Sequence, residues 1–99
     1  MGTPERPNPE PRFPLGQTLA TPGALAALSQ AEQTPDEFLA RHQAGDWGEL
    51  CEEDVAENEL SLEKGFRLLS AYRLNNGTRI WIITERDRSA TTILLPEEY

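Results

Sequence analysis

The stretch "ARHQAGDWGELCEED", residues 40–54, holds most of the side chains that could do chemistry in this 99-residue chain. It contains the only histidine, His42, the only cysteine, Cys51, one of two tryptophans, Trp47, and a run of carboxylates. Imidazole and thiolate are common zinc ligands, and together they can form a base and its nucleophile. A zinc site needs three or four ligands at recognisable spacing, and a nucleophilic site needs a group that orients the base. The sequence shows neither pattern, so we expect no metal, no cofactor and no Cys–His catalytic couple.

A second polar segment, "TERDRSATT" at residues 84–92, lies at the end of a predicted hairpin. A small enzyme or ligand-binding domain would need both segments in one pocket, because catalytic groups must reach one reacting centre. The polar cluster of that interpretation comprises Arg41, His42, Asp46, Trp47, Glu85, Asp87 and Arg88. The alternative is structural: turn chemistry accounts for Asp87, Trp47 fills a small core, and His42 packs beside Phe38 in the last turn of a helix. We favour the structural interpretation and therefore a protein without catalytic activity.

Carboxylates dominate the middle of the chain. The net charge of −8 is uneven, because residues 32–63 contain eleven carboxylates and only Arg41, whereas residues 64–90 contain six basic side chains. Phosphate backbones repel an acidic protein, so direct binding to nucleic acid is not expected. Two interpretations of the acidic run stay open. It is a solvated helix face, or it imitates a row of phosphates and occupies the basic groove of a DNA-binding protein.

Helices are expected in the first two thirds of the chain. Thr21-Pro22 and Thr34-Pro35 each place an N-cap hydroxyl before a proline, which is typical of a helix start. They predict helices over about residues 22–31 and 35–44, and Glu37 predicts a reciprocal capping box with Thr34. A third helix, with a poorer apolar stripe, is expected over about residues 52–64.

After Gly65 the hydrophobic period changes from 3.6 to 2, which indicates strands. Segments 66–74 and 78–85 flank an Asn-Gly pair that is typical of a two-residue type I′ hairpin turn. A third strand is expected over residues 90–96. The elements together predict an α+β fold in which two or three N-terminal helices pack on a three-stranded antiparallel β-meander.

The predicted turn also sets which residues share a face of the sheet. Tyr72 would pair with Trp81 and Ala71 with Ile82, because a two-residue turn fixes the register. The core face would then carry Leu69, Ala71, Ile80, Ile82, Ile93 and Leu95. Tyr72 and Trp81 would lie on the opposite face, which is too apolar to be left bare. The candidate interaction face therefore comprises Tyr72 and Trp81 with the acidic residues Glu52, Glu53, Asp54 and Glu57.

The first fourteen residues differ from the rest in composition. They contain five of the eight prolines and a single large apolar side chain, Phe13. Such a segment buries too little to offset its ordering entropy, so we expect a disordered leader over residues 1–14 and one domain over residues 15–99. No secretion signal or membrane-length apolar run is visible, and we expect a cytoplasmic protein without membrane contact.

Several strings in this chain are similar to a known group of proteins. "LGQTLATPGAL", "LARHQAGDWGELCEED", "LLSAY", "WIITERDRS" and "TTILLPEEY" resemble short uncharacterised bacterial proteins labelled "plasmid-related protein" or "type I restriction endonuclease subunit M". The resemblance covers about residues 15–99 and is most specific over residues 41–48. It implies a setting of plasmids, phage defence and counter-defence. A methyltransferase needs a cofactor-binding Rossmann-like domain and an Asn-Pro-Pro-Phe type motif, which these 99 residues lack, so the label is attributed to gene neighbourhood.

These observations favour a small acidic protein-interaction module of a mobile element or defence system. It would engage a larger protein partner, such as a nucleic-acid enzyme that it modulates, through the acidic helix or through the Tyr72/Trp81 face. The alternative is the small enzyme or ligand-binding domain built on the seven-residue polar cluster. The sequence does not specify an oligomeric state.

Overall fold

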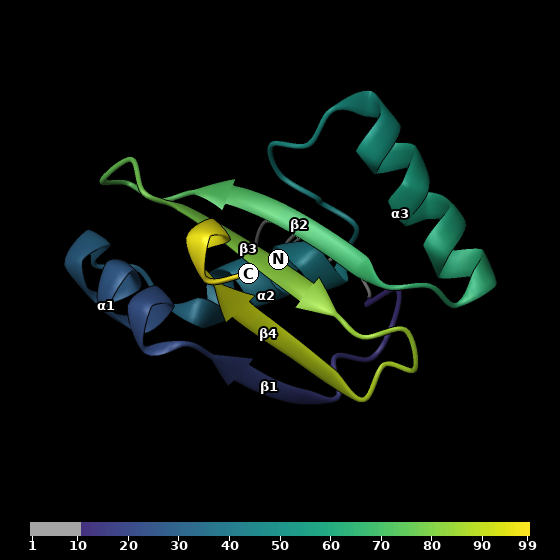
Figure 1. Ribbon diagram of the computed structural model, residues 1–99, viewed down its shortest axis with the longest axis horizontal. Coiled ribbons are helices and arrows are strands. Elements are labelled where there is room, and N and C mark those ends of the chain that lie inside the picture. Colours follow the sequence, from purple (N-terminus) through teal and green to yellow (C-terminus); the bar gives the residue numbers. More distant parts are fainter. Residues whose placement is uncertain (1–10) are drawn as a thin grey trace, which may run out of the picture.

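The computed structural model describes residues 11–99 (Figure 1). The elements follow the order β1 (Gln17–Ala20), α1 (Pro22–Ala31), α2 (Pro35–Gln43), α3 (Glu52–Lys64), β2 (Leu68–Arg73), β3 (Arg79–Thr84), β4 (Ala90–Leu94) and the short 3₁₀ turn η1 (Pro96–Glu98). The α+β class is therefore confirmed. Within residues 11–99, no helix is both long and apolar enough to cross a membrane.

The sheet differs from the prediction, because it has four strands in the order β1-β4-β3-β2. Strands β2, β3 and β4 form the expected antiparallel meander, and β1 adds to β4 in parallel, with Gln17 opposite Ala90 and Ala20 opposite Ile93. The three-stranded antiparallel sheet was thus wrong as a complete description. Strand β1 has only four residues, and an edge strand this short gives too little alternation to be recognised in the sequence.

The three helices begin and end close to the predicted residues. Thr21 caps α1, since its Oγ1 accepts a hydrogen bond from the Ala24 amide at 3.1 Å. The capping box predicted at Thr34 is absent, and Glu37 instead accepts a hydrogen bond from the Gln33 side chain at 3.2 Å. Helix α3 spans Glu52–Lys64, and Gly65 ends it in a left-handed conformation.

The hairpin between β2 and β3 has a three-residue loop in place of the predicted two-residue turn. Leu74 and Thr78 close the loop with a 2.7 Å backbone hydrogen bond, and Gly77 takes a φ of +87°. This arrangement corresponds to a type I turn followed by a left-handed residue. The register therefore shifts by one residue, so that Tyr72 pairs with Ile80 and Ala71 with Trp81.

The register shift exchanges side chains between the two faces of the sheet. The inner face carries Leu68, Ser70, Tyr72, Ile80, Ile82, Thr84, Thr91 and Ile93. The outer face carries Leu69, Ala71, Arg73, Arg79, Trp81, Ile83, Thr92 and Leu94. Two expectations were therefore wrong. Leu69 and Ala71 do not belong to the core face, and Tyr72, only 1% exposed, does not share a face with Trp81.

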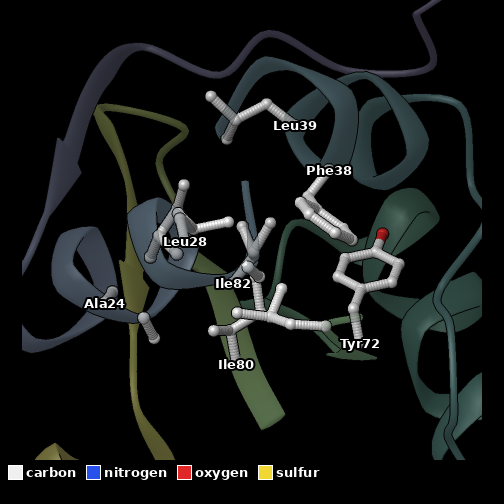
Figure 2. Packing of buried hydrophobic residues seen from close by; sticks show 11 residues of the cluster. Ala24, Leu28, Phe38, Leu39, Tyr72, Ile80 and Ile82 are labelled. Atoms are coloured by element: carbon white, nitrogen blue, oxygen red, sulfur yellow. The ribbon is translucent and has the colours of Figure 1, made fainter. Parts of the chain in front are cut away.

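The main core lies between the inner face and helices α1 and α2. Figure 2 shows Phe38 and Leu39 of α2 and Leu28 of α1 above Tyr72, Ile80 and Ile82. The ring centroids of Phe38 and Tyr72 are 5.3 Å apart, and Leu28 is 1% exposed. In Figure 1, α2 lies behind the sheet, and η1 lies in front of it, on the outer face.

A second core cluster brings the N-terminal segment into the fold. Phe13 is 7% exposed and packs with Trp47 and Leu68, beside Leu15 and the α3 residues Val55 and Leu62. The predicted leader falls outside the described residues up to residue 10. Among residues 11–14, Phe13 is buried and the Arg12 amide donates to the Gln43 carbonyl at 2.8 Å, whereas the side chains of Pro11, Arg12 and Pro14 are exposed. The sequence alone does not reveal the space that Phe13 fills.

Two sets of hydrogen bonds pair backbone groups along the free edge of β2. The Gly48 region forms a parallel bridge with Ala71, in which Glu49 N–H donates to Ala71 O and Ala71 N–H donates to Trp47 O. The side-chain amide of Asn58, on α3, then donates to Leu69 O at 2.6 Å and accepts from Leu69 N–H at 3.1 Å. Buried backbone groups need such partners, so α3 and the turn before it are positioned along this edge.

Candidate interaction face

His42 is the centre of a buried polar network beneath α2. It is fully buried, with Nδ1 at 2.5 Å from Ser70 Oγ and Nε2 at 2.9 Å from Thr84 Oγ1. Thr84 Oγ1 lies 2.7 Å from Thr91 Oγ1, and Thr91 donates to the Leu15 carbonyl at 2.7 Å. The three hydroxyls come from the inner faces of β2, β3 and β4. The network therefore joins α2, three strands and the N-terminal segment.

The Leu15 carbonyl fixes the direction of the hydrogen bonds that run from His42 Nε2 through Thr84 to Thr91. A carbonyl can only accept, so the single hydroxyl hydrogen of Thr91 is committed to it. Thr84 must then donate to Thr91, and His42 Nε2–H must donate to Thr84. The ring therefore carries a hydrogen on Nε2. Burial favours the neutral ring, in which Nδ1 has no hydrogen and accepts from Ser70 Oγ.

Burial keeps His42 neutral over a wide pH range. Desolvation, with a smaller contribution from the positive charge of Arg88, lowers the pKa of His42 from 6.5 to about 3. Ser70 and His42 have the spacing of a nucleophile and its base, but both are 0% exposed. A general base works best when its pKa lies near the operating pH, which this environment prevents. The network stabilises the fold, and substrate does not reach it in this conformation.

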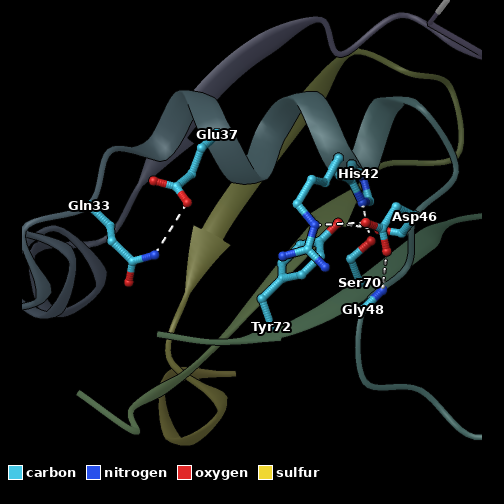
Figure 3. Close-up of polar contacts among 8 residues, drawn as sticks. Gln33, Glu37, His42, Asp46, Gly48, Ser70 and Tyr72 are labelled. Atoms are coloured by element: carbon cyan, nitrogen blue, oxygen red, sulfur yellow. Dashed lines mark hydrogen bonds and ion pairs between the residues drawn. The ribbon is translucent and has the colours of Figure 1, made fainter. Parts of the chain in front are cut away.

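The turn after α2 is held by Arg41 and Asp46 (Figure 3). Arg41 Nε lies 2.7 Å from Asp46 Oδ2, and the Arg41 guanidinium stacks over the Tyr72 ring at 4.6 Å. Asp46 Oδ1 also accepts from the Gly48 amide, and its carbonyl accepts from Tyr72 Oη at 2.5 Å. The hydrogen bond from Arg41 holds the pKa of Asp46 below its ordinary value, and burial raises that of Tyr72.

Trp47 fills the core, as predicted for a side chain under a loop, and it is 4% exposed. Its indole N–H donates to Glu59 at 3.1 Å, and the same carboxylate receives two hydrogen bonds from Arg12 at 3.0 and 2.8 Å. The Trp47 ring stacks on Phe13 with centroids 6.2 Å apart. His42 meets these two rings edge-on.

Arg88 anchors the loop between β3 and β4 to the end of α3. It has a φ of +61°, and its guanidinium donates to the carbonyls of Phe66 at 2.6 Å and Ser61 at 3.1 Å. Cations are favourable beside the free carbonyls at a helix C-terminus. Asp87 accepts from the Ser89 amide in a turn, as predicted from turn chemistry. Glu85 is exposed, and its backbone closes the same hairpin.

The seven residues of the predicted polar cluster thus occupy three neighbourhoods. Arg41 pairs with Asp46 on the surface, His42 and Trp47 face the core, and the loop residues close the β3–β4 hairpin. Phe13 lies between the last two groups, because its ring is 5.2 Å from His42 and 5.8 Å from the Arg88 guanidinium. Sequence analysis missed Phe13, Ser70, Thr84, Thr91 and Glu59, whose roles arise only from long-range contacts.

A different site opens on the outer face, between β2, β3 and the start of α3. A groove of about 340 Å³ is lined by Glu49, Leu50, Cys51, Asp54, Leu69, Ala71, Arg79, Trp81 and Pro96. We call it the outer groove. Trp81 is half-buried, and Tyr99, which follows η1, packs against it with ring centroids 5.7 Å apart. Trp81 and Asp54 are the two residues of the candidate interaction face that line this groove.

The rim of the outer groove is charged. Glu49 lies 3.4 Å from Arg73 and 3.6 Å from Arg79, and these three side chains are about half exposed. The four acidic residues of the candidate interaction face, Glu52, Glu53, Asp54 and Glu57, are exposed in the first two turns of α3. In the described part of the chain, none of these four carboxylates forms an ion pair.

The described residues also limit metal chemistry. Between residues 11 and 99, no group of three or more His, Cys, Asp or Glu side chains is placed to hold a metal ion.

Comparisons with protein-family models, with curated proteins and with solved structures return no match to this chain.

Proposed function

We propose that this protein is a small protein-interaction module and that its partner contacts the outer groove around Trp81. The observation that carries the proposal is the groove itself, whose lining includes the partly buried ring of Trp81. Aromatic side chains in concave apolar sites are typical centres of protein interfaces. The groove lining also includes Asp54, one of the exposed carboxylates at the start of α3.

The distribution of polar groups supports an interaction role over catalysis. His42, Ser70 and Thr84 are fully buried and bonded to one another. Arg41 pairs with Asp46, and Arg88 binds backbone carbonyls. Each group is engaged in holding the fold, whereas a catalytic group must also reach a substrate.

The proposed setting comes from the sequence resemblance to bacterial proteins labelled as plasmid-related or as restriction subunits. In that setting the proposed partner is a larger enzyme that acts on nucleic acid, and this protein modulates it in the cytoplasm. The net charge of −8 supports contact with a protein in preference to direct contact with DNA.

A plug variant tests the proposal. Cys51 is exposed and lines the outer groove, so Cys51→Trp places a large ring in it, whereas Cys51→Ser leaves it open. Serine is also a favoured N-cap residue, so this control should preserve α3. Affinity capture from the native host with wild type and both variants, followed by mass spectrometry, measures the partner recovered.

We expect one protein to co-purify with wild type and with Cys51→Ser and to be lost with Cys51→Trp. Equal recovery with all three proteins would contradict the proposed contact surface. Recovery of no protein by wild type, in a host where the chain is expressed, would contradict the interaction role itself. Circular dichroism and melting temperature confirm that the variants remain folded.

A further inference from the structure

We infer that the partner presents a basic segment carrying one large apolar side chain, and that this side chain enters the outer groove between Trp81 and α3. The inference rests on the proposed function and adds the chemistry of the partner. It depends on three features. These are the apolar residues that line the groove, the carboxylates at the start of α3 that form no ion pair among the described residues, and Asp54, which belongs to both sets.

The floor and walls of the groove favour an apolar side chain. The apolar part of the lining comprises Leu50, Leu69, Ala71, Trp81 and Pro96. The burial of apolar surface drives most association between proteins, and a pocket that accepts one anchoring side chain typically dominates the binding energy.

The rim favours positive charge on the partner. Arg73 and Arg79 share the single Glu49 carboxylate, so one of their two positive charges is compensated within the protein. On the α3 side of the groove, Asp54 belongs to the lining, and neither Asp54 nor its neighbours Glu52, Glu53 and Glu57 form an ion pair among residues 11–99. The positive end of the α3 dipole amounts to roughly half a charge and cannot neutralise four carboxylates.

Asp54 connects the two properties, because it lines the groove and belongs to the unpaired acidic turn. A lysine or arginine next to the anchoring side chain would therefore meet a carboxylate while the anchor is inserted. The same charges disfavour two other occupants. Nucleic acid and a second copy of this chain, with a net charge of −8, would both bring further negative charge to the rim.

Peptide selection tests this chemistry directly. A phage-displayed library of random twelve-residue peptides is selected on the full chain, and the recovered peptides are synthesised and titrated by fluorescence anisotropy. Asp54→Asn/Glu57→Gln removes two rim charges without changing side-chain size. The matched control, Glu32→Gln/Glu63→Gln, removes two exposed charges elsewhere, and Glu63 lies about 13.5 Å of helix rise beyond Asp54.

We expect the selected peptides to carry lysine or arginine around one leucine, isoleucine, phenylalanine or tryptophan. Their affinity should fall about fivefold with Asp54→Asn/Glu57→Gln, stay unchanged with the control, and weaken as salt is added. Binding that Cys51→Trp abolishes, but that shows no basic preference or no response to the rim variant, would overturn the inference and leave the proposed function intact. Recovery of no peptide that depends on the groove would contradict both.

Discussion

At the scale of single residues, His42 lies at the centre of the buried polar network that joins α2 to the sheet. Its imidazole forms hydrogen bonds with Ser70 of β2 and Thr84 of β3. Further hydrogen bonds from Thr84 to Thr91 and from Thr91 to the Leu15 carbonyl extend the network. Every buried side-chain nitrogen and oxygen in the described residues has a hydrogen-bond partner. The network therefore stabilises the fold only while the ring stays neutral, since a charged ring would place a second donor against Ser70 and an uncompensated charge in the core.

The stability of the protein should fall as the pH drops below 6.5. The folded state keeps the pKa of His42 near 3, whereas the unfolded chain has the ordinary value of 6.5, so acid favours the unfolded state. Between pH 7 and pH 5 the unfolding free energy should decrease by about 2 kcal/mol from this residue alone. Urea denaturation at pH 7, 6 and 5 measures the change.

The variant His42→Gln provides the control for this pH dependence. It should be less stable than wild type at pH 7, because a glutamine cannot reproduce both ring contacts. Its stability should vary little between pH 7 and 5, since carboxylates such as Asp46 and Glu59 have lowered pKa values and titrate below this range. An equal pH slope in both proteins would exclude His42 as the source.

Only part of this network could be predicted from the sequence. The position of His42 in the last turn of a helix follows from the capping signals around Thr34 and Gly45. Its partners Ser70, Thr84 and Thr91 do not, because assigning them to the inner face requires the strand register. The register depended on whether Asn75 belongs to the loop or to the strand. That single difference also placed Tyr72 beside Trp81 in the predicted interaction face.

At the scale of elements, the edge of β2 depends on how closely the preceding turn can approach it. Gly48 has a φ of +78°, and a Cβ atom placed there would lie 2.0 Å from the Ala71 carbonyl oxygen. The backbone bridge that closes the edge therefore requires the absence of a side chain. Gly77, with a φ of +87°, has the same kind of backbone but open space around it.

The two glycines give a matched pair of substitutions. Gly77→Ala should cost about 1–2 kcal/mol of unfolding free energy, which is the strain of a left-handed alanine. Gly48→Ala carries the same strain and must also displace β2 or the turn, so a loss of at least about 3 kcal/mol is expected. Chemical denaturation of both variants measures the difference. Equal losses would show that the turn can move away from β2 without cost.

Only some of the residues that line the outer groove could be predicted from the sequence to lie there. Trp81 could be assigned to the non-core face by alternation along β3. Cys51 and Pro96 could not be predicted to lie near it, because the position of α3 depends on the Asn58 amide and on Arg88, whose partners are backbone groups. Short-range patterns thus identified the helices, and long-range polar contacts positioned them.

At the scale of the whole molecule, Phe13 joins parts of the chain that are distant in sequence. Its ring contacts Trp47 and His42, and the Arg88 guanidinium lies over it at 5.8 Å from the centroid. Gln43 donates to its carbonyl at 2.8 Å. The segment before β1 therefore closes the second core cluster against α3 and β2.

Phe13→Ala should destabilise the entire protein by about 3–5 kcal/mol, because it removes a buried aromatic ring that the neighbouring rings cannot replace. Leu25→Ala is the matched surface control, since Leu25 lies on α1 with 48% of its surface exposed and should change stability by less than about 0.5 kcal/mol. Melting temperatures of the three proteins measure the effect. Similar melting temperatures would show that residues 11–14 add little to the folded domain.

The parallel pairing of β1 with β4 has a consequence for synthesis on the ribosome. Gln17 pairs with Ala90, and the Oγ1 of Thr21, the N-cap of α1, donates to Glu98 Oε1 at 2.5 Å. These contacts can form only after residues more than seventy positions later in the sequence have been synthesised. Pairings this distant in sequence form slowly. The nascent chain can build the helices and the β2–β3 hairpin as they emerge, but β1 has no neighbouring strand until β4 leaves the exit tunnel. Closure of the domain is therefore a late event, completed by its final strand and turn.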